Sequence, residues 1–248
     1  MAASVELKNV SYAYPDGRQV LHNIDLKIEA GEKFGLIGPM GAGKSTLLLQ
    51  LNGILNGTGR IQIGQTLITK DTLAEIRRSV GLVFQNPDDQ LFNPTVEEDI
   101  AFGPLNFGYS KTEAAKMVHD AVVAMQLEGF EKAVPHHLSM GERKRVALAT
   151  VLAMQPEVIA FDEPFSSLDA SMTTQLVHTI NQLKSTVIII SQSFLPLMAC
   201  CQRVGLMNKG KIIATGDVKD ILSNDKLLLE NGIDLRMYKQ IWTEMYRN

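Results

Sequence analysis

Eight residues in the first quarter of the chain follow the pattern of a glycine, four further residues and then Gly-Lys-Ser. A short apolar run at 33–37 precedes this segment, and a run with helical spacing at 44–52 follows it. In such a strand, loop and helix, inward-pointing amides and the positive end of the helix dipole surround phosphate groups. The lysine reaches the β- and γ-phosphates, and the next hydroxyl binds Mg²⁺. We therefore expect ATP to bind at Gly38, Pro39, Met40, Gly41, Ala42, Gly43, Lys44, Ser45 and Thr46.

Two adjacent carboxylates, Asp162 and Glu163, follow an apolar run at 158–161 that has the length of a buried strand. A carboxylate at the end of a buried strand is costly unless it faces a cation. We expect Asp162 to join Ser45 in binding Mg²⁺, and Glu163 to polarise the water that attacks the γ-phosphate. The alternative interpretation of this segment alone is that Asp162 and Glu163 are solvated residues at the end of a strand and have no chemical role.

Strand-like and helix-like segments alternate along the rest of the chain. Residues 5–12 and 20–28 alternate apolar and polar side chains on either side of a turn at 15–17, which predicts an antiparallel pair. Further strands are predicted at 60–67, 80–84, 158–161, 186–190, 204–207 and 211–214, and helices at 112–127, 139–154 and 171–183. This order predicts an α/β fold: a phosphate-loop NTPase core with a mainly parallel sheet, an N-terminal antiparallel β-subdomain and an inserted helical subdomain.

We interpret the whole chain, 1–248, as a single ATPase domain. The antiparallel strands and the ATP-binding core would occupy 1–91 and 155–216. The segment from about 92 to 154 lacks buried strands and is interpreted as the helical subdomain, and 217–248 as a short helical tail.

Composition excludes several classes of protein. The net charge of −3 argues against a general nucleic-acid binder, so we expect no nucleic-acid partner. No apolar run reaches the roughly 18–20 residues that span a bilayer, and the N-terminus lacks the features of a secretion signal. The two cysteines, Cys200 and Cys201, are too few for a disulfide framework and predict a reduced, cytoplasmic compartment with buried thiols.

Residues 138–145, with the sequence LSMGERKR, lie just ahead of the strand that ends at Asp162. They resemble the signature sequence of ATP-binding-cassette (ABC) ATPases, in which Ser139 and Gly141 match and Met140 replaces the first glycine of the usual pair. The resemblance implies that Ser139 and Gly141, at a helix N-terminus, bind the γ-phosphate of ATP held by an opposite subunit. The positive end of the helix makes that contact favourable.

Other segments resemble the same family in the same order along nearly the whole chain, about residues 5–220. The resemblance implies that Gln85 contacts Mg²⁺ and the membrane partner, and that Asp169 belongs to a loop at the dimer interface. Tyr14 stands where an aromatic side chain stacks on adenine, with Tyr12 as the competing candidate. Gln192 replaces the histidine that the family usually has beside the γ-phosphate. A glutamine donates a hydrogen bond but carries no charge, which implies slow hydrolysis.

The subfamily signal lies in LVFQNPDDQLF at 82–92, TVEEDIAFGP at 95–104 and PHHLS at 135–139. These segments closely resemble the ATPases of energy-coupling-factor transporters, especially those that import cobalt or nickel. The resemblance implies a peripheral subunit at the cytoplasmic face of the membrane. Its partners would be a second ATPase subunit, identical or homologous, a transmembrane coupling protein and a substrate-capture membrane protein. A non-transport ABC ATPase and a binding-only cassette, the latter motivated by Met140 and Gln192, remain alternatives.

Overall fold

The computed structural model describes residues 2–245. Its N-terminal strands form an antiparallel sheet in the order β2-β1-β4-β5. The sheet comprises β1 (Val5–Ala13), β2 (Gln19–Ile28), β4 (Thr58–Ile63) and β5 (Thr66–Leu67). The alternation of apolar and polar residues in β1 and β2 produces this sheet, because one face is buried and the other reaches solvent.

The second sheet has six strands in the order β10-β9-β3-β8-β7-β6. Its members are β3 (Lys33–Ile37), β6 (Val80–Val83), β7 (Val158–Asp162), β8 (Thr186–Ile190), β9 (Arg203–Asn208) and β10 (Lys211–Asp217). All neighbours pair in parallel except β9 and β10. The predicted mainly parallel sheet is therefore confirmed. The strand predicted at 80–84 as buried is instead the half-buried edge strand β6, because only β7 pairs with it.

Both faces of the parallel sheet are buried, which explains its continuous apolar strands. Phe34, Ala160 and Ile188 point toward the antiparallel sheet and pack with α1 (Lys44–Leu51). Ile159 and Ile189 point to the opposite face and pack against the helices there. Helix α1 thus lies within the core between the two sheets, and it fixes the loop that precedes it.

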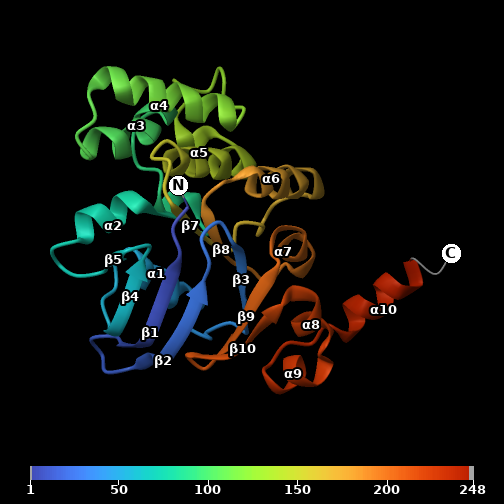
Figure 1. Cartoon of the computed structure of the whole chain (residues 1–248). Helices are drawn as coiled ribbons and strands as arrows, with labels where there is room; N and C mark the ends of the chain where they lie inside the picture. Colours follow the sequence, from blue (N-terminus) through green and yellow to red (C-terminus); the bar gives the residue numbers. More distant parts are fainter. Residues whose placement is uncertain (1, 246–248) are drawn as a thin grey trace.

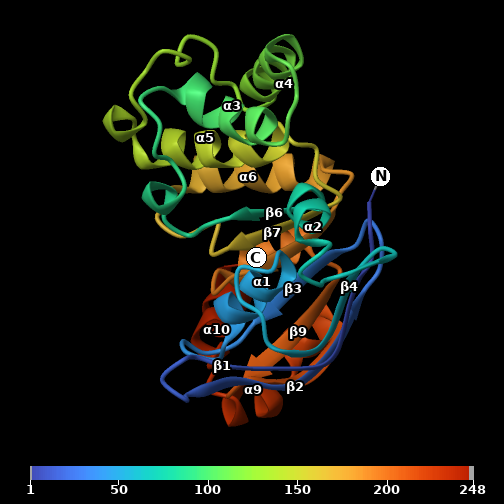
Figure 2. The same cartoon turned by 90° about the vertical axis from the view of Figure 1, so that its left-hand side faces the viewer.

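Helices α3 (Val96–Asn106), α4 (Lys111–Ala124) and α5 (Met140–Leu152) form a layer above the parallel sheet (Figure 1). Figure 2 shows α5 and α6 (Ala170–Gln182) lying over the edge of the sheet at β6 and β7. Ser110 and Ser139 begin α4 and α5 with capping boxes, as polar residues at these positions favour. Between 92 and 154, the segment predicted as a helical subdomain, the described structure has helices and one short 3₁₀ turn but no strand. The division into subdomains is a proposal.

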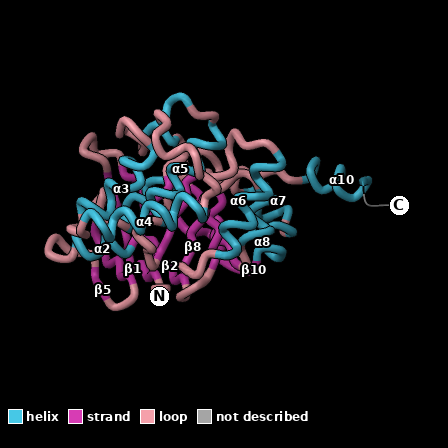
Figure 3. Tube along the Cα trace, turned by 90° about the horizontal axis from the view of Figure 1, so that it is seen from above, coloured by secondary structure: helices cyan, strands magenta, loops and turns pink. Residues whose placement is uncertain are grey.

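Two further helices, α2 (Leu73–Ser79) and α7 (Phe194–Cys200), were not predicted. Each has only seven residues, which is too short for the spacing of its apolar residues to distinguish a helix. After β10 the chain forms α8 (Val218–Ser223), α9 (Asp225–Glu230) and α10 (Arg236–Met245). Helix α10 extends away from the rest of the molecule in Figures 1 and 3.

Candidate nucleotide-binding site

The glycine-rich loop 38–43 joins β3 to α1, as the sequence predicts. A side chain at Gly38 would place its Cβ only 2.0 Å from the carbonyl oxygen of Met207 in β9. Gly43 has a left-handed backbone, with φ of 100°, at the N-cap of α1. These two glycines let the loop turn tightly at the start of the helix, where free amides and the helix dipole favour an anion.

Lys44 is buried at the first position of α1. Its Nζ donates to the carbonyl oxygens of Gly38 at 2.8 Å and Pro39 at 3.0 Å, so the ammonium group lies inside the curve of the loop. Burial lowers the pKa of Lys44, while the charges of Glu163 and Asp162 act in the opposite direction. A desolvated ammonium in this position attracts a phosphate strongly.

Asp162 ends β7 and faces the start of α1. Burial raises the pKa of its carboxyl, and a hydrogen bond from Ser45 and the charge of Lys44 oppose that effect. The Ser45 hydroxyl and the Asp162 carboxylate are the oxygen ligands that Mg²⁺ prefers. Two of the three residues predicted to hold Mg²⁺, Ser45 and Asp162, are therefore in contact, and their chemistry fits the ion.

Glu163 has a left-handed backbone, with φ of 47°. Its N–H donates to the carbonyl oxygen of Ile190 at 2.9 Å, and the N–H of Gln192 donates to its Oε2 at 3.1 Å. Its Oε1 is buried and has no hydrogen-bond partner among the described residues. Burial raises the pKa of this carboxyl. One oxygen of Glu163 is thus held by the backbone, and the other is available to accept a proton or a hydrogen bond.

Lys44, Ser45, Asp162 and Glu163 line one cleft of about 880 Å³. Gln85, Gln192 and Tyr14 also line it. The Tyr14 hydroxyl lies 3.2 Å from Oγ1 of Thr46, and its ring meets the ring of Tyr12 edge to face at 5.1 Å. Tyr12 packs instead against the core between the sheets. Tyr14 is thus the better placed of the two candidate tyrosines for a nucleotide base.

Three basic residues of the cleft were not predicted: Arg18, His22 and Lys209. The guanidinium of Arg18 lies 5.3 Å from the centre of the Tyr14 ring. Lys209 belongs to the turn between β9 and β10, where the N–H of Gly210 donates to the carbonyl oxygen of Ala42 at 3.0 Å. Arg18 follows a predicted turn close to Tyr14, which is a weak signal. No local pattern indicates that the 209–210 turn touches the phosphate loop.

Five predicted binding residues do not line this cleft: Gly38 and Pro39 at the start of the loop, and Ser139, Gly141 and Asp169 elsewhere in the chain. Ser139 is exposed and caps α5, and Asp169 caps α6 by accepting from the N–H of Met172 at 2.8 Å. A Cβ on Gly141 would lie 2.3 Å from the sulfur of Met172. The clashing atoms belong to the end of a flexible side chain that can move aside, so packing within this chain does not by itself require a glycine at 141.

The loop that carries Gln85 is tied to α5. The Gln90 side chain accepts from the N–H of Phe84 at 3.2 Å and donates to the carbonyl oxygen of Ala147 at 2.7 Å. In the same loop, Asp88 forms an ion pair with Arg143 at 2.6 Å. One helix thus supports both the Gln85 loop and the exposed Ser139 terminus.

A family profile described as ABC transporter matches residues 21–166, which run from β2 to just beyond Glu163. The chain belongs to the ABC transporter family. Like other ABC transporter ATPases, it hydrolyses ATP in a reaction coupled to transport. The family binds ATP, typically together with Mg²⁺.

Relatives of this ABC ATPase match it over most of their length. The energy-coupling factor transporter ATP-binding protein EcfA of Methanocaldococcus jannaschii is 48% identical, with 93% of this chain and 85% of that protein covered. The EcfA protein of Methanococcus maripaludis is 45% identical, with 94% of this chain and 86% of that protein covered.

Solved structures of ABC ATPases confirm the phosphate-loop NTPase fold. One is cbiO1 of Clostridium perfringens, part of the ABC transporter complex cbiONQ, with a TM-score of 0.81, 31% identity and coverage of 96% of this chain and 97% of that chain. Another is the cassette MJ0796 in a dimeric post-hydrolysis state bound to ADP and Pi, with a TM-score of 0.77, 27% identity and coverage of 86% and 98%. Among the described residues of this ABC ATPase, no helix is long and apolar enough to cross a membrane.

Proposed function

We propose that this chain is the ATP-binding and hydrolysing subunit of an energy-coupling-factor importer, with cobalt or nickel ions as the transported substrate. The observation that carries the ATPase assignment is the partnerless, buried Oε1 of Glu163 in the same cleft as Lys44, Ser45 and Asp162. The relatives named EcfA and the likeness to cbiO1, part of the ABC transporter complex cbiONQ, support the energy-coupling-factor type. Cobalt or nickel is proposed from the resemblance carried by residues 82–104 and 135–139.

Mg²⁺ would be held by the Ser45 hydroxyl and the Asp162 carboxylate, with the Gln85 side-chain oxygen as a third ligand. These groups lie on three separate segments that line one cleft. When bound, the ion neutralises phosphate charge. The remaining phosphate charge would fall to Lys44 and to the amides of the loop, and the ring of Tyr14 would stack on adenine with Arg18 beyond it.

Glu163 would act on the attacking water. Its free Oε1 accepts a hydrogen bond from the water and orients it, while the N–H of Gln192 fixes Oε2. The side chain of Gln192 is exposed within the cleft and would donate to the γ-phosphate. Catalysis would consist mainly of positioning and charge neutralisation.

The site would be completed by a second ATPase subunit, another copy of this chain or a homologue. Ser139 and Gly141 of that subunit would approach the γ-phosphate, and its Asp169 loop would cross the interface. The exposure of Ser139, away from the cleft of its own chain, supports this arrangement. ATP binding would then favour the closed pair, because only that state makes both sets of contacts.

The membrane partners would be a transmembrane coupling protein and a substrate-capture membrane protein, with this chain bound at the cytoplasmic face. The exposed rings of Phe92 and Phe102 meet edge to face at 4.9 Å beside the Gln85 loop and offer an apolar contact. Co-purification of the chain with membrane proteins, followed by measurement of cobalt and nickel uptake by the complex, tests the partners and the substrate.

A partner-dependent or binding-only cassette is the second candidate function. It is favoured by Gln192, which cannot titrate near neutral pH, and by Met140 at the first position of α5, next to the exposed cap Ser139. In that case the chain would bind ATP and would support turnover only beside a different, fully active subunit.

Replacement of Glu163 tests the proposed hydrolysis. Wild-type protein should turn over Mg·ATP slowly, and Glu163→Gln should reduce turnover at least about 100-fold while ATP still binds, because only the group that acts on water has changed. Steady-state phosphate release and fluorescent-nucleotide binding measure the two properties. The exposed Glu128→Gln provides the matched control. Equal turnover by Glu163→Gln and wild type would exclude the proposed role of Glu163.

A further inference from the structure

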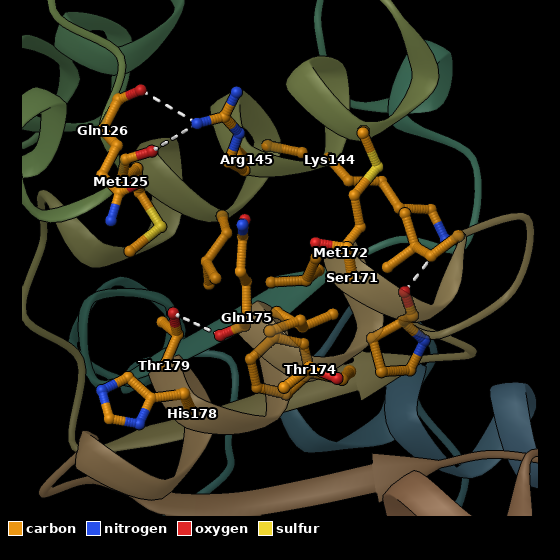
Figure 4. A pocket seen from close by; sticks show the side chains of 18 of the residues that line it. Met125, Gln126, Lys144, Arg145, Ser171, Met172, Thr174, Gln175, His178 and Thr179 are labelled. Carbon is orange, nitrogen blue, oxygen red and sulfur yellow. Dashed lines mark hydrogen bonds between the residues drawn. The ribbon is translucent and has the colours of Figure 1, made fainter.

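Lys144 lies on α5, one turn after Gly141. It borders a second pocket of about 640 Å³ between α5 and α6 (Figure 4). Its side chain is half-buried and reaches from α5 to the connection between β7 and α6. That connection begins with Glu163.

The ammonium group of Lys144 has three acceptors. Nζ donates to the carbonyl oxygen of Pro164 at 3.0 Å, to Oγ of Ser166 at 3.2 Å and to the carbonyl oxygen of Ser166. The Ser166 hydroxyl in turn donates to the carbonyl oxygen of Glu163 at 2.8 Å. An ammonium has three N–H donors, so the turn uses all of them.

The backbone of this turn is strained at both ends. Glu163 and Ser167 have φ values of 47° and 59°, in the left-handed region that disfavours residues with a Cβ. Such conformations are unfavourable and persist only where the surroundings hold them. Lys144 supplies that support from a helix outside the turn.

The two neighbouring basic residues on α5 are used elsewhere. Arg143 pairs with Asp88 in the Gln85 loop. Arg145 donates to the carbonyl oxygens of Met125 at 3.3 Å and Gln126 at 2.9 Å, at the end of α4 (Figure 4). Each of the three basic residues therefore anchors a different segment to α5, and the Glu163 turn is assigned to Lys144.

No carboxylate lies within ion-pair distance of Lys144 among the described residues. Burial lowers the pKa of Lys144 to about 8, and the charge of Glu163 opposes that effect. Removing an ammonium group from water costs free energy, and carbonyl and hydroxyl oxygens compensate for this cost less than a carboxylate would. Fold stability alone therefore does not explain the position of Lys144.

We propose that Lys144 is a positioning residue for ATP hydrolysis, which holds the Glu163 turn in register with the start of α5. The inference rests on the proposed role of Glu163. Through this contact, a movement of the Ser139 end of α5 would be transmitted to the carboxylate that acts on water. Lys144 thereby affects the chemical step without contacting ATP.

Three variants of the full chain test this role: Lys144→Met, Lys144→Arg and, as a control, Lys116→Met on the exposed face of α4. Lys144→Met should lower kcat about 100-fold, because a shift of about 1 Å in a reacting group has that effect. The KM for ATP should change less than about twofold, because binding contacts are intact. Lys144→Arg should restore kcat to within about tenfold of wild type, since a guanidinium can donate to the same oxygens.

Ser166→Ala keeps the test decisive if Lys144→Met does not fold. Loss of the Ser166 hydroxyl should lower kcat several-fold. In the double variant with Lys144→Arg, the loss of kcat should be smaller than the product of the two single losses, because both residues belong to one hydrogen-bond network. An unchanged kcat in Lys144→Met or Ser166→Ala, or a loss of ATP binding equal to the loss of turnover, would overturn the proposal. If wild-type protein has no turnover or Glu163→Gln is fully active, the proposed function itself fails instead.

Discussion

At the scale of single residues, the contact between Gln192 and Glu163 separates the backbone of residue 192 from its side chain. The bond to Oε2 of Glu163 comes from the backbone N–H of Gln192, so it does not depend on the side chain at 192. The side chain is exposed in the cleft and acts separately. Substitutions at 192 therefore test the proposed contact with the γ-phosphate, while the backbone bond to Glu163 is preserved.

Gln192→His is expected to raise ATP turnover, because an imidazole can carry a charge near the phosphate and glutamine cannot. The rate of the variant should also acquire a pH dependence near the ordinary imidazole pKa of about 6.5, with the protonated form favoured beside the anion. Turnover measured from pH 6 to 9 checks both effects, and Gln192→Ala is the control that removes the amide. A rate that is unchanged or lower would mean that glutamine is already adapted to this site.

At the scale of elements, the end of β9 and the β9–β10 turn contact the phosphate loop and support it. The N–H of Gly210 donates to Ala42, and the carbonyl oxygen of Met207 fills the space beside Gly38. A Cβ on Gly210 would lie 2.1 Å from the carbonyl oxygen of Val20, and its φ is +74°. Since the clash is with backbone, the turn itself would have to move.

Gly210→Ala should therefore lower the free energy of unfolding by more than about 2 kcal/mol. It should also weaken ATP binding about tenfold, because the support of the loop at Ala42 is lost. Gly108→Ala is the matched control: its φ is +83°, but its Cβ would have nothing within 4 Å. That change should cost only about 1 kcal/mol and leave ATP affinity unaltered. Urea unfolding measures the free energy of unfolding, and nucleotide titration measures the affinity for ATP. Equal effects in the two variants would contradict the proposal that the β9–β10 turn supports the loop.

At the scale of the whole molecule, the cleft and the exposed end of α5 lie on separate parts of one chain. Tyr14, Lys44 and Glu163 line the cleft, and Ser139 does not. A chain with these two separate surfaces can pair head to tail with a second subunit, so that each nucleotide is covered from both sides.

Glu163→Gln protein is accordingly expected to form dimers when Mg·ATP is added, because bound ATP is no longer cleaved. Sedimentation velocity should show a monomer without nucleotide and a species of twice the mass with it. Glu163→Gln combined with Lys44→Met should stay monomeric, since Lys44 is the residue proposed to hold the phosphates. Equal dimer content with and without ATP would contradict nucleotide-driven pairing, and a homologous partner subunit would be required if no dimer forms.

The sequence by itself determined the phosphate loop at 38–45, the carboxylates Asp162 and Glu163 after a buried strand, and the cap at Ser139. These features are local, because strand, loop and helix signals and helix caps depend on residues close together in the chain. The order of such motifs was also sufficient for the family. Repeated apolar strands with helices between them were sufficient for the mainly parallel sheet.

Only the tertiary structure decided which distant residues meet. The approach of Arg18 and Lys209 to the cleft depends on how the two sheets pack over α1. The hydrogen bond between Lys144 and Ser166 depends on α5 lying beside the connection between β7 and α6. Side-chain contacts between segments far apart in the chain leave no periodic signal in either segment, so packing alone reveals that the helix beginning at Ser139 also holds the turn of Glu163.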